Sequence, residues 1–371
     1  TAELEKSEEG RTLLQWQGST PVQLLNELFE SEEVKVHFLN RLTVLNIAPD
    51  QHGLGWICLF RILLAEAPIC VGGSGQLAAG LRSALEANGG AVQTGLGVRQ
   101  ILTRGNRAVG VEFEDGTRAE TAKAVITNVE PKKSFLQMVG EESLPDTFAT
   151  RVKNYHSRGR SLFALHLALS EPPRYRAAAD NSSVDISFSQ EMFGGSVEEQ
   201  VRAYHDIAMG SPPRRAMLQV TLPTIFDPSQ APDGKHTAVI WQYAPYNVSP
   251  RGPEGWRDLR VEYASYVLDL WRSYAPNITQ DKILAMTIQD PTDTVQINDN
   301  FINGVEVVGD LSPDQMGFFR PFANWSNYRS PLDGLYMCGG YCHPGGGVHA
   351  GAGHNAATVI AEDFALNKWW G

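Results

Sequence analysis

The chain has 371 residues, of which 42% are hydrophobic and 20% are charged, and its formal net charge is -11. This composition indicates a globular protein that is long enough for two core-bearing units. The negative balance, with no compensating basic block, disfavours a nucleic-acid partner, and no uncharged apolar run reaches the roughly 18 residues of a membrane-spanning helix.

The first 35 residues have helix-like spacing. Leu24, Leu25, Leu28 and Phe29 fall on one side of this pattern, which predicts a helix whose apolar stripe faces the core. The segment "LGWICLFRILL" (54–64) is the most apolar stretch, but it is short and carries a charge. We interpret it as a buried segment, with a surface that touches a bilayer or an oily ligand as the alternative.

Residues 72–90 predict a well-delimited helix. Ser74 is a candidate N-cap, leucines follow at i, i+4 and i+8 (Leu77, Leu81, Leu85), and Gly89 is a stop signal. The next segment alternates like strands and breaks at Gly105-Asn106 and Asp115-Gly116, which predicts two hairpins and then a strand at 123–127. A helix, an antiparallel meander and a return strand are typical of flavin folds and of many other α+β domains.

From about residue 150 to 330 the pattern predicts a second unit. Strands are expected at 161–169 and 236–248, and an amphipathic helix at 255–276, so we expect a mixed sheet covered by helices. A short buried strand is expected at 334–340, and a helix at 355–366.

The stretch "YMCGGYCHPGGGVHAGAGHNAATVIAEDF" (336–364) joins these last two elements through a glycine-rich segment. Glycine lets the backbone approach a ligand closely, and the free N–H groups of a helix start supply donors and partial positive charge. A tight turn without a ligand is the alternative. The length of the run, with His343-Pro344 and with Asn355 at the expected helix start, favours a cofactor.

The four cysteines, Cys58, Cys70, Cys338 and Cys342, are too few for a disulfide scaffold, so a reducing compartment is expected. Cys338 and Cys342 have a C-x3-C spacing, with three histidines following them in the same stretch. A glycine-rich backbone fixes ligand geometry poorly, so no metal site is predicted.

The segment "CHPGGGVHAGAGHNAATVIAED" resembles the C-terminal flavin motif of phytoene-desaturase-like FAD-dependent oxidoreductases, in the branch of the pyridine nucleotide-disulphide oxidoreductase domain-containing flavoproteins. Other segments agree in order, among them "GGSGQLAAGLRSALEANGGAVQTGLGVRQIL" and "VITNVEPKKSFLQMV". The resemblance implies an α/β, two-domain FAD-linked fold with a glutathione-reductase-type FAD domain, here incomplete, and a mixed-sheet substrate domain. It assigns 71–140 and 331–371 to the FAD domain and 1–70 and 141–330 to the substrate domain.

The resemblance also implies FAD as cofactor and assigns roles to residues. Val98 matches a position whose backbone meets the adenine, and Asn355 and Ala356 match a helix start that faces the pyrimidine end of the flavin. The residues implied to lie along the flavin ring and ribityl chain are Gly339, Gly340, His343, Pro344, Gly345, Gly346, Gly347 and Val348.

Flavoproteins of this kind begin with a strand, a G-x-G-x-x-G turn and a helix, which hold the pyrophosphate. That unit is not found in this sequence. We expect it to be a separate chain or a cleaved N-terminal piece, with a late start of the given sequence, or a loss of flavin binding, as the alternatives. The chain alone is expected to be unstable and inactive, because its parallel sheet would have a bare edge.

The implied reaction is hydride transfer from a substrate C–H to flavin N5, on a largely apolar substrate or an amine. His343 is a weak candidate for the base, and His166, Tyr243 and Arg320 are candidate substrate-pocket residues, with Arg320 orienting either an acidic substrate or a loop. Two alternatives stay open. An amine or amino-acid oxidase would need an aromatic cage, such as Trp241 with Tyr243 or Trp325 with Tyr328, and a non-catalytic interaction protein would keep only the shell. The expected location is cytoplasmic or, in a eukaryote, the mitochondrial matrix, with peripheral membrane contact as a further option.

Overall fold

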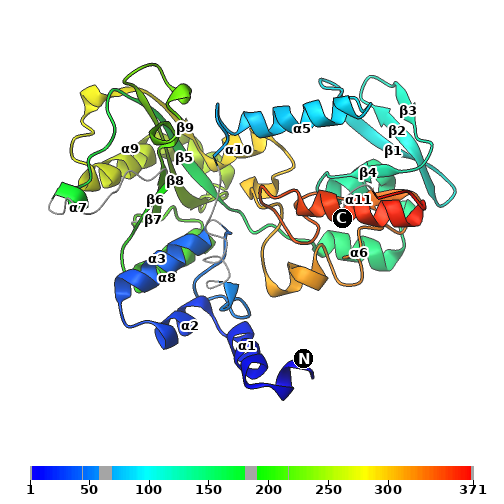
Figure 1. The fold of residues 1–371 in the computed structure, drawn as a ribbon, viewed down its shortest axis with the longest axis horizontal. Coiled ribbons are helices and arrows are strands. Elements are labelled where there is room, and N and C mark those ends of the chain that lie inside the picture. The colour runs from blue at the N-terminus through cyan, green and yellow to red at the C-terminus, as the bar shows by residue number, and fades with distance from the viewer. Residues whose placement is uncertain (1, 44, 58–68, 180–189, 216, 369–371) are drawn as a thin grey trace. The chain divides into compact units, whose positions relative to one another are not determined.

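The computed structural model describes residues 2–43, 45–57, 69–179, 190–215 and 217–368, and Figure 1 shows their elements. The chain divides into two compact units. The first unit comprises residues 1–92 and 159–297, and the second unit comprises residues 93–158 and 298–371.

The first unit combines helices with one sheet. Its helices are α1 (Glu8–Gly18), α2 (Pro21–Leu28), α3 (Glu32–Thr43), α5 (Gly75–Ala87), α7 (Arg176–Ala179), α8 (Val197–Ala208), α9 (Trp256–Tyr274) and α10 (Pro291–Ile297). Its strands are β5 (Arg160–Leu169), β6 (Gln190–Gly194), β7 (Met217–Thr221), β8 (His236–Pro245) and β9 (Ile283–Gln289).

The five strands of the first unit form one sheet in the order β6-β7-β8-β5-β9. Every neighbouring pair of these described strands is antiparallel, where a mixed sheet had been expected. Along β5, Phe163, Leu165 and Leu167 pack in one core cluster with the buried residues of α9. Because successive side chains of a strand point to opposite faces, Leu162, Ala164 and His166 lie on the face away from α9.

The second unit holds two small sheets and three helices. Strands β1 (Val98–Arg104), β2 (Arg107–Phe113) and β3 (Arg118–Glu120) form an antiparallel meander, and β4 (Val125–Thr127) pairs in parallel with β10 (Leu335–Met337). The helices are a π-helix (Lys132–Gly140), α6 (Asp146–Asn154) and α11 (Gly351–Asp363). The predicted hairpin breaks are present, and Gly105 and Gly116 have positive φ there.

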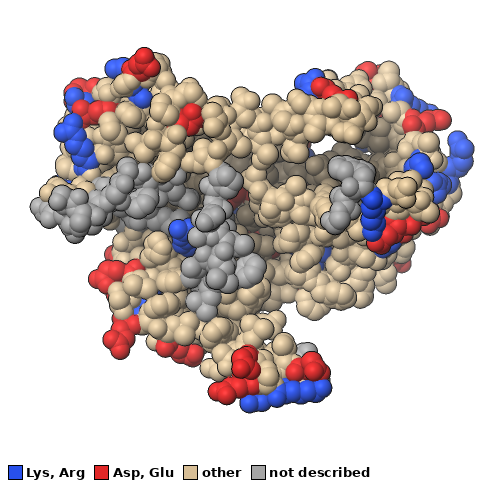
Figure 2. All heavy atoms as spheres, in the orientation of Figure 1, with Lys and Arg blue, Asp and Glu red and all other residues tan. Residues whose placement is uncertain are grey.

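An aromatic cluster forms much of the core of the second unit. The ring of Phe148 packs edge-on against three others, with centroid distances of 4.8 Å to Phe135, 5.4 Å to Phe322 and 4.7 Å to Trp325. Charged side chains of both signs lie over β1–β3 (Figure 2), where the buried carboxylate of Glu112 pairs with Arg118 at 2.6 Å. The expected α/β class with several sheets and helices is therefore confirmed.

Two predictions about helices need correction. The last helix begins at Gly351 rather than at residue 355. The sequence did not indicate this start because Gly351 and Gly353, which lie in the first turn, are poor helix formers. Leu24 and Leu25 are buried as predicted, but Leu28, at the end of α2, is 41% exposed. Of the apolar segment 54–64, Leu54 and Ile57 are buried, and residues 58–64, with Cys58, lie outside the described part of the chain.

Helix α5 has the predicted bounds and an unexpected environment. None of its residues is buried, and its three periodic leucines, Leu77, Leu81 and Leu85, are 42%, 61% and 46% exposed. On the second unit, Ile126 of β4 is 54% exposed. Apolar side chains at helical or strand spacing that remain in water indicate surfaces that another segment covers.

Candidate functional site

The glycine-rich segment follows directly on the buried strand β10. The N–H of Cys338 continues the parallel pairing by donating to Thr127 O at 2.8 Å. Gly339, Gly345 and Gly347 then have φ values of +99°, +120° and +141°, a region that favours glycine. The strand therefore passes into a loop whose path depends on glycine at these three positions.

The glycines of this loop fall into two groups. A Cβ atom on Gly346 would lie 2.6 Å from Val307 O, and one on Gly340 would lie 3.3 Å from Gly346 Cα. These two glycines are needed because the loop packs tightly on its own chain. A Cβ on Gly353 would have no heavy atom within 4 Å, and the Val348 side chain is 88% exposed. One side of the segment is thus packed, and the side at Val348 and Gly353 is open.

Arg320 supports the packed side of the loop. It is completely buried, and its guanidinium makes six hydrogen bonds to five backbone carbonyls. The acceptors are Gly340 O from Nε (3.1 Å) and Nη2 (2.7 Å), Asp310 O (3.2 Å) and Gln315 O (3.0 Å) from Nη1, and Val307 O (3.2 Å) and Val308 O (2.7 Å) from Nη2. Because every N–H group is used, the geometry supports the loop-orienting role of Arg320 over contact with a substrate.

Tyr328 links the loop to helix α11. Its hydroxyl donates to His343 O at 2.8 Å and accepts from Asn355 Nδ2 at 2.7 Å, and burial raises the pKa of this phenol. The hydroxyl therefore stays protonated at neutral pH and can hold both partners. Asn355 lies one turn inside α11, not at its first residue, so its implied contact with the pyrimidine end of a flavin would come from its side chain and remains a prediction.

The start of α11 offers hydrogen-bond donors on the open side. Ala350 caps the helix with a φ of +52°, and the N–H of Gly351 donates to His349 Nδ1 at 3.0 Å. The N–H groups of Ala352 and Gly353 have no acceptor among the described residues. Two free donors beside a position without a Cβ, in the positive field of a helix start, fit a flat ring that carries acceptor atoms. Sequence reasoning missed Gly353 and the capping role of His349.

His343 is an exposed residue of the same loop, and part of its imidazole is shielded from water. Burial lowers the pKa of its imidazole, and the positive charge of Arg320 lowers it further. The ring is therefore neutral at neutral pH and able to accept a proton. Burial also raises the pKa values of Cys338 and Cys342, so both thiols remain protonated. Among the residues that the structure describes, no three His, Cys, Asp or Glu side chains gather in a way that would hold a metal ion.

The other candidate residues divide between the two units. His166 and Tyr243 share the sheet face away from α9, where His166 Nε2 lies 3.2 Å from Gln289 Oε1 and Tyr243 is buried. Trp241 lies between them in the register on that face. Trp325 and Tyr328, by contrast, pack in the core of the second unit. Val98 is the first residue of β1, and its adenine contact remains a prediction.

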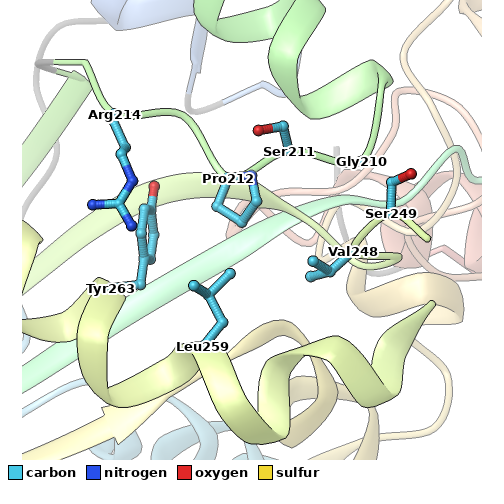
Figure 3. Close-up of a pocket in the computed structure, with 8 residues that line it drawn as sticks. All are labelled: Gly210, Ser211, Pro212, Arg214, Val248, Ser249, Leu259 and Tyr263. Atoms are coloured by element: carbon cyan, nitrogen blue, oxygen red, sulfur yellow. The ribbon is translucent and has the colours of Figure 1, made fainter. Parts of the chain in front are cut away.

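The described residues line one pocket in each unit, and neither of these two pockets includes a residue of the glycine-rich loop. The first unit has a pocket of about 290 Å³, in which Leu259 of α9 lies across from Pro212, and Arg214 and Ser249 lie at opposite ends (Figure 3). The second unit has one of about 470 Å³ beside Tyr155 and Phe319. In the first pocket Arg214 pairs with Glu262, so its charge is already matched.

The second unit thus carries a glycine-rich strand-to-helix turn that is packed on one side and open at Val348 and Gly353. In a comparison with protein families, residues 5–293 match the model of the flavin containing amine oxidoreductases. The chain belongs to this family, and the expected FAD-dependent oxidoreductase class is confirmed at that level.

Curated relatives include a mouse protein, pyridine nucleotide-disulfide oxidoreductase domain-containing protein 2. It is 29% identical over 356 residues, which are 92% of this chain and 60% of that protein. One of the subunits of the limonene dehydrogenase of Castellaniella defragrans is 27% identical over 98% of this chain and 68% of its own length. A phytoene desaturase of a Paracoccus species is 28% identical over 79% of this chain. The chain thus spans about 60% of the length of the mouse relative.

Solved structures show the same fold. An oxidoreductase from Methanosarcina mazei superposes with a TM-score of 0.59 at 17% identity, over 94% of this chain and 68% of that one. A putrescine oxidase variant superposes with a TM-score of 0.57 at 14% identity, over 97% of this chain and 70% of that one. These similarities show that the chain shares the fold of these two proteins.

Proposed function

We propose that this chain is the larger part of an FAD-dependent dehydrogenase or desaturase, which removes hydride from a substrate C–H bond. The observation that carries the proposal is the start of α11, where the N–H groups of Ala352 and Gly353 have no acceptor among the described residues. Gly353 lies on the open side of a loop that Arg320 fixes on its other side. When bound there, the flavin would supply the hydride acceptor.

The residues of this chain would position the flavin and stabilise the charge that forms on it. The N–H groups of Ala352 and Gly353, at a helix start, would stabilise negative charge on a ring held against them. Arg320 would keep the loop in one conformation, so that no reorganisation is needed during the reaction. His343, neutral at neutral pH, is the candidate group to accept a proton. Val348, which is exposed, would gain an apolar contact.

An amine oxidase is the second candidate. The family match supports it, and Trp241 and Tyr243 lie on one sheet face, as two walls of an aromatic cage would. Amines should then bleach the flavin spectrum under anaerobic conditions where alkenes and alcohols do not.

The exposed apolar side chains support a partner segment. We expect a nucleotide-binding βαβ segment, in the same polypeptide or in another chain, to cover the leucines of α5 and the exposed Ile126 of β4. The limonene dehydrogenase relative is one component of an enzyme of several chains, which agrees with this expectation. Among the described residues no helix is long and apolar enough to cross a membrane. The cytoplasmic or mitochondrial location remains an expectation.

Two alanine variants test the site, in protein purified with any chain that accompanies it. Gly353→Ala adds a Cβ on the open side, so it should stabilise the flavin-free helix by about 0.5–1 kcal/mol and weaken flavin retention at least about tenfold, or about 1.4 kcal/mol. Gly346→Ala should lower both stability and flavin content, because its Cβ meets Val307 O. If Gly353→Ala kept the wild-type flavin content, the flavin would not lie over this turn.

A further inference from the structure

Arg160 is a cation without an acceptor among the residues that the structure describes. Its Nε is buried, and no nitrogen of its guanidinium has a hydrogen-bond or ion-pair acceptor in the described ranges. Its side chain instead lies over the ring of Tyr204, with 5.5 Å between the guanidinium carbon and the ring centroid. Arg260, another partly buried arginine, pairs by contrast with Asp290 and Asp293.

The surroundings of Arg160 are fixed by the fold. Asn46 is fully buried and donates from Nδ2 to Arg160 O at 2.8 Å, while its own Oδ1 is buried without a partner. The ring of Tyr204 holds the planar guanidinium from one side. A guanidinium that is oriented in this way, with its N–H groups unused, is suited to bind a bidentate acceptor such as a carboxylate.

The register places Arg160 on the sheet face away from α9. Arg160 pairs with Pro245 at the start of β5, and the next residues on that face are Leu162, opposite Tyr243, and Ala164, opposite Trp241. The row of Ala164 lies four residues along the strand, or about 13 Å at ~3.3 Å per residue. A row of apolar and aromatic side chains of that length therefore extends from the unpaired cation, with Leu162 and Trp241 partly exposed and Ala164 and Tyr243 buried.

A second unpaired donor lies on the same face. Gln219 pairs directly with Trp241 across β7 and β8. Its side chain is 93% buried, since 7% is exposed, and its Nε2 has no hydrogen-bond partner. The face thus combines one unmatched cation and one unmatched amide with apolar side chains between them.

We propose that Arg160 binds the carboxylate of the substrate, and that the substrate is an organic acid whose apolar body lies along Leu162, Tyr243 and Trp241, within reach of the Gln219 amide. This rests on the proposed function, because it names the substrate class of the same enzyme. It separates this chain from enzymes that act on pure hydrocarbons, for which a partly buried cation without an acceptor would have no use.

The test compares two probes of one shape, 3-phenylpropanoate and its neutral amide, by titration calorimetry with the protein as purified. Wild type should bind the acid at least ten times more tightly than the amide. Arg160→Gln should abolish this preference and leave the affinity for the amide unchanged, while Arg160→Lys should keep part of it. Arg257→Gln, at an exposed arginine (79%), should behave as wild type.

Two outcomes would overturn the proposal: a wild-type protein that does not prefer the acid, or an Arg160→Gln variant that still does. Near-ultraviolet circular dichroism establishes that each variant is folded. If Arg160→Gln is not folded, the preference of Arg160→Lys for the acid over the amide is used instead, and it should be smaller than that of wild type. The flavin spectrum reports separately on the glycine-rich loop of the second unit. Selective acid binding by a colourless protein would refute the proposed function and leave the role of Arg160 intact.

Discussion

Replacing Arg320 with methionine should unfold or loosen the glycine-rich loop. Methionine has a similar length but no donor, so five buried carbonyls lose the guanidinium that they share. A buried polar group left without a partner costs about 1–3 kcal/mol, and removing one member of a buried charged network typically costs about 3–5 kcal/mol. Removing the charge also relieves its own desolvation, so we expect a net loss of about 4 kcal/mol.

A loss of that size is a large share of the roughly 5–15 kcal/mol by which domains are stable. It should appear in urea-dependent pulse proteolysis of the purified protein, together with loss of flavin. The stability of Arg320→Lys should fall between those of wild type and Arg320→Met, because lysine keeps the charge and loses most of the hydrogen bonds. Arg257→Met, at a side chain 79% exposed, should change stability by less than about 0.5 kcal/mol. If Arg320→Met stayed within about 1 kcal/mol of wild type, Arg320 would not support the loop.

Three further changes test other parts of the account. Tyr328→Phe leaves His343 O without its donor and should cost about 1–3 kcal/mol and lower flavin content; an unchanged flavin content would exclude this link. Asp363→Asn breaks a bidentate pair with Arg329 and should cost up to about 1 kcal/mol at neutral pH. Hydrogen bonding to Arg329 holds the pKa of Asp363 below its usual 3.8. The stabilisation by this pair is therefore present above pH 3.8 and is lost as the pH falls through the lower pKa of the folded protein. The unfolding midpoints of the variant and of wild type should converge in acid. Leu81→Glu on α5 should abolish co-purification of a covering chain and thereby lower the stability of this chain; retention of the covering chain would show that α5 is not its contact surface.

Local signals in the sequence predicted the helices and turns well where the conformational preferences of nearby residues determine them. Gly105 and Gly116 end strands because they adopt positive φ, and the leucine spacing between Ser74 and Gly89 gives the bounds of α5. The start of α11 could not be found in this way, because Gly351 and Gly353 are poor helix formers whose place there is set by packing and by open space.

The residues that support the site were harder to predict because their roles depend on contacts far apart in the chain. Arg320 was expected either to face a substrate or to order a loop, and only the positions of carbonyls from Val307 to Gly340 distinguish the two. Arg160 carried no motif at all. Its unpaired state is visible only when the register of β5 and the position of Tyr204 are known.

The exposed leucines illustrate a second limit. Their spacing predicts an amphipathic helix, and it does not say what the apolar side packs against. In the structure that side of α5 is in water, which agrees with a covering segment such as the nucleotide-binding piece that the sequence predicts.

The central claim is that the turn into α11 holds a flavin. Its most direct test is the visible absorption spectrum of the wild-type protein, purified with every chain that accompanies it and compared with Gly353→Ala. The account predicts a yellow wild-type protein with the two flavin bands, and a variant that is folded and largely colourless. A wild-type complex that is fully folded and colourless after incubation with FAD would contradict it.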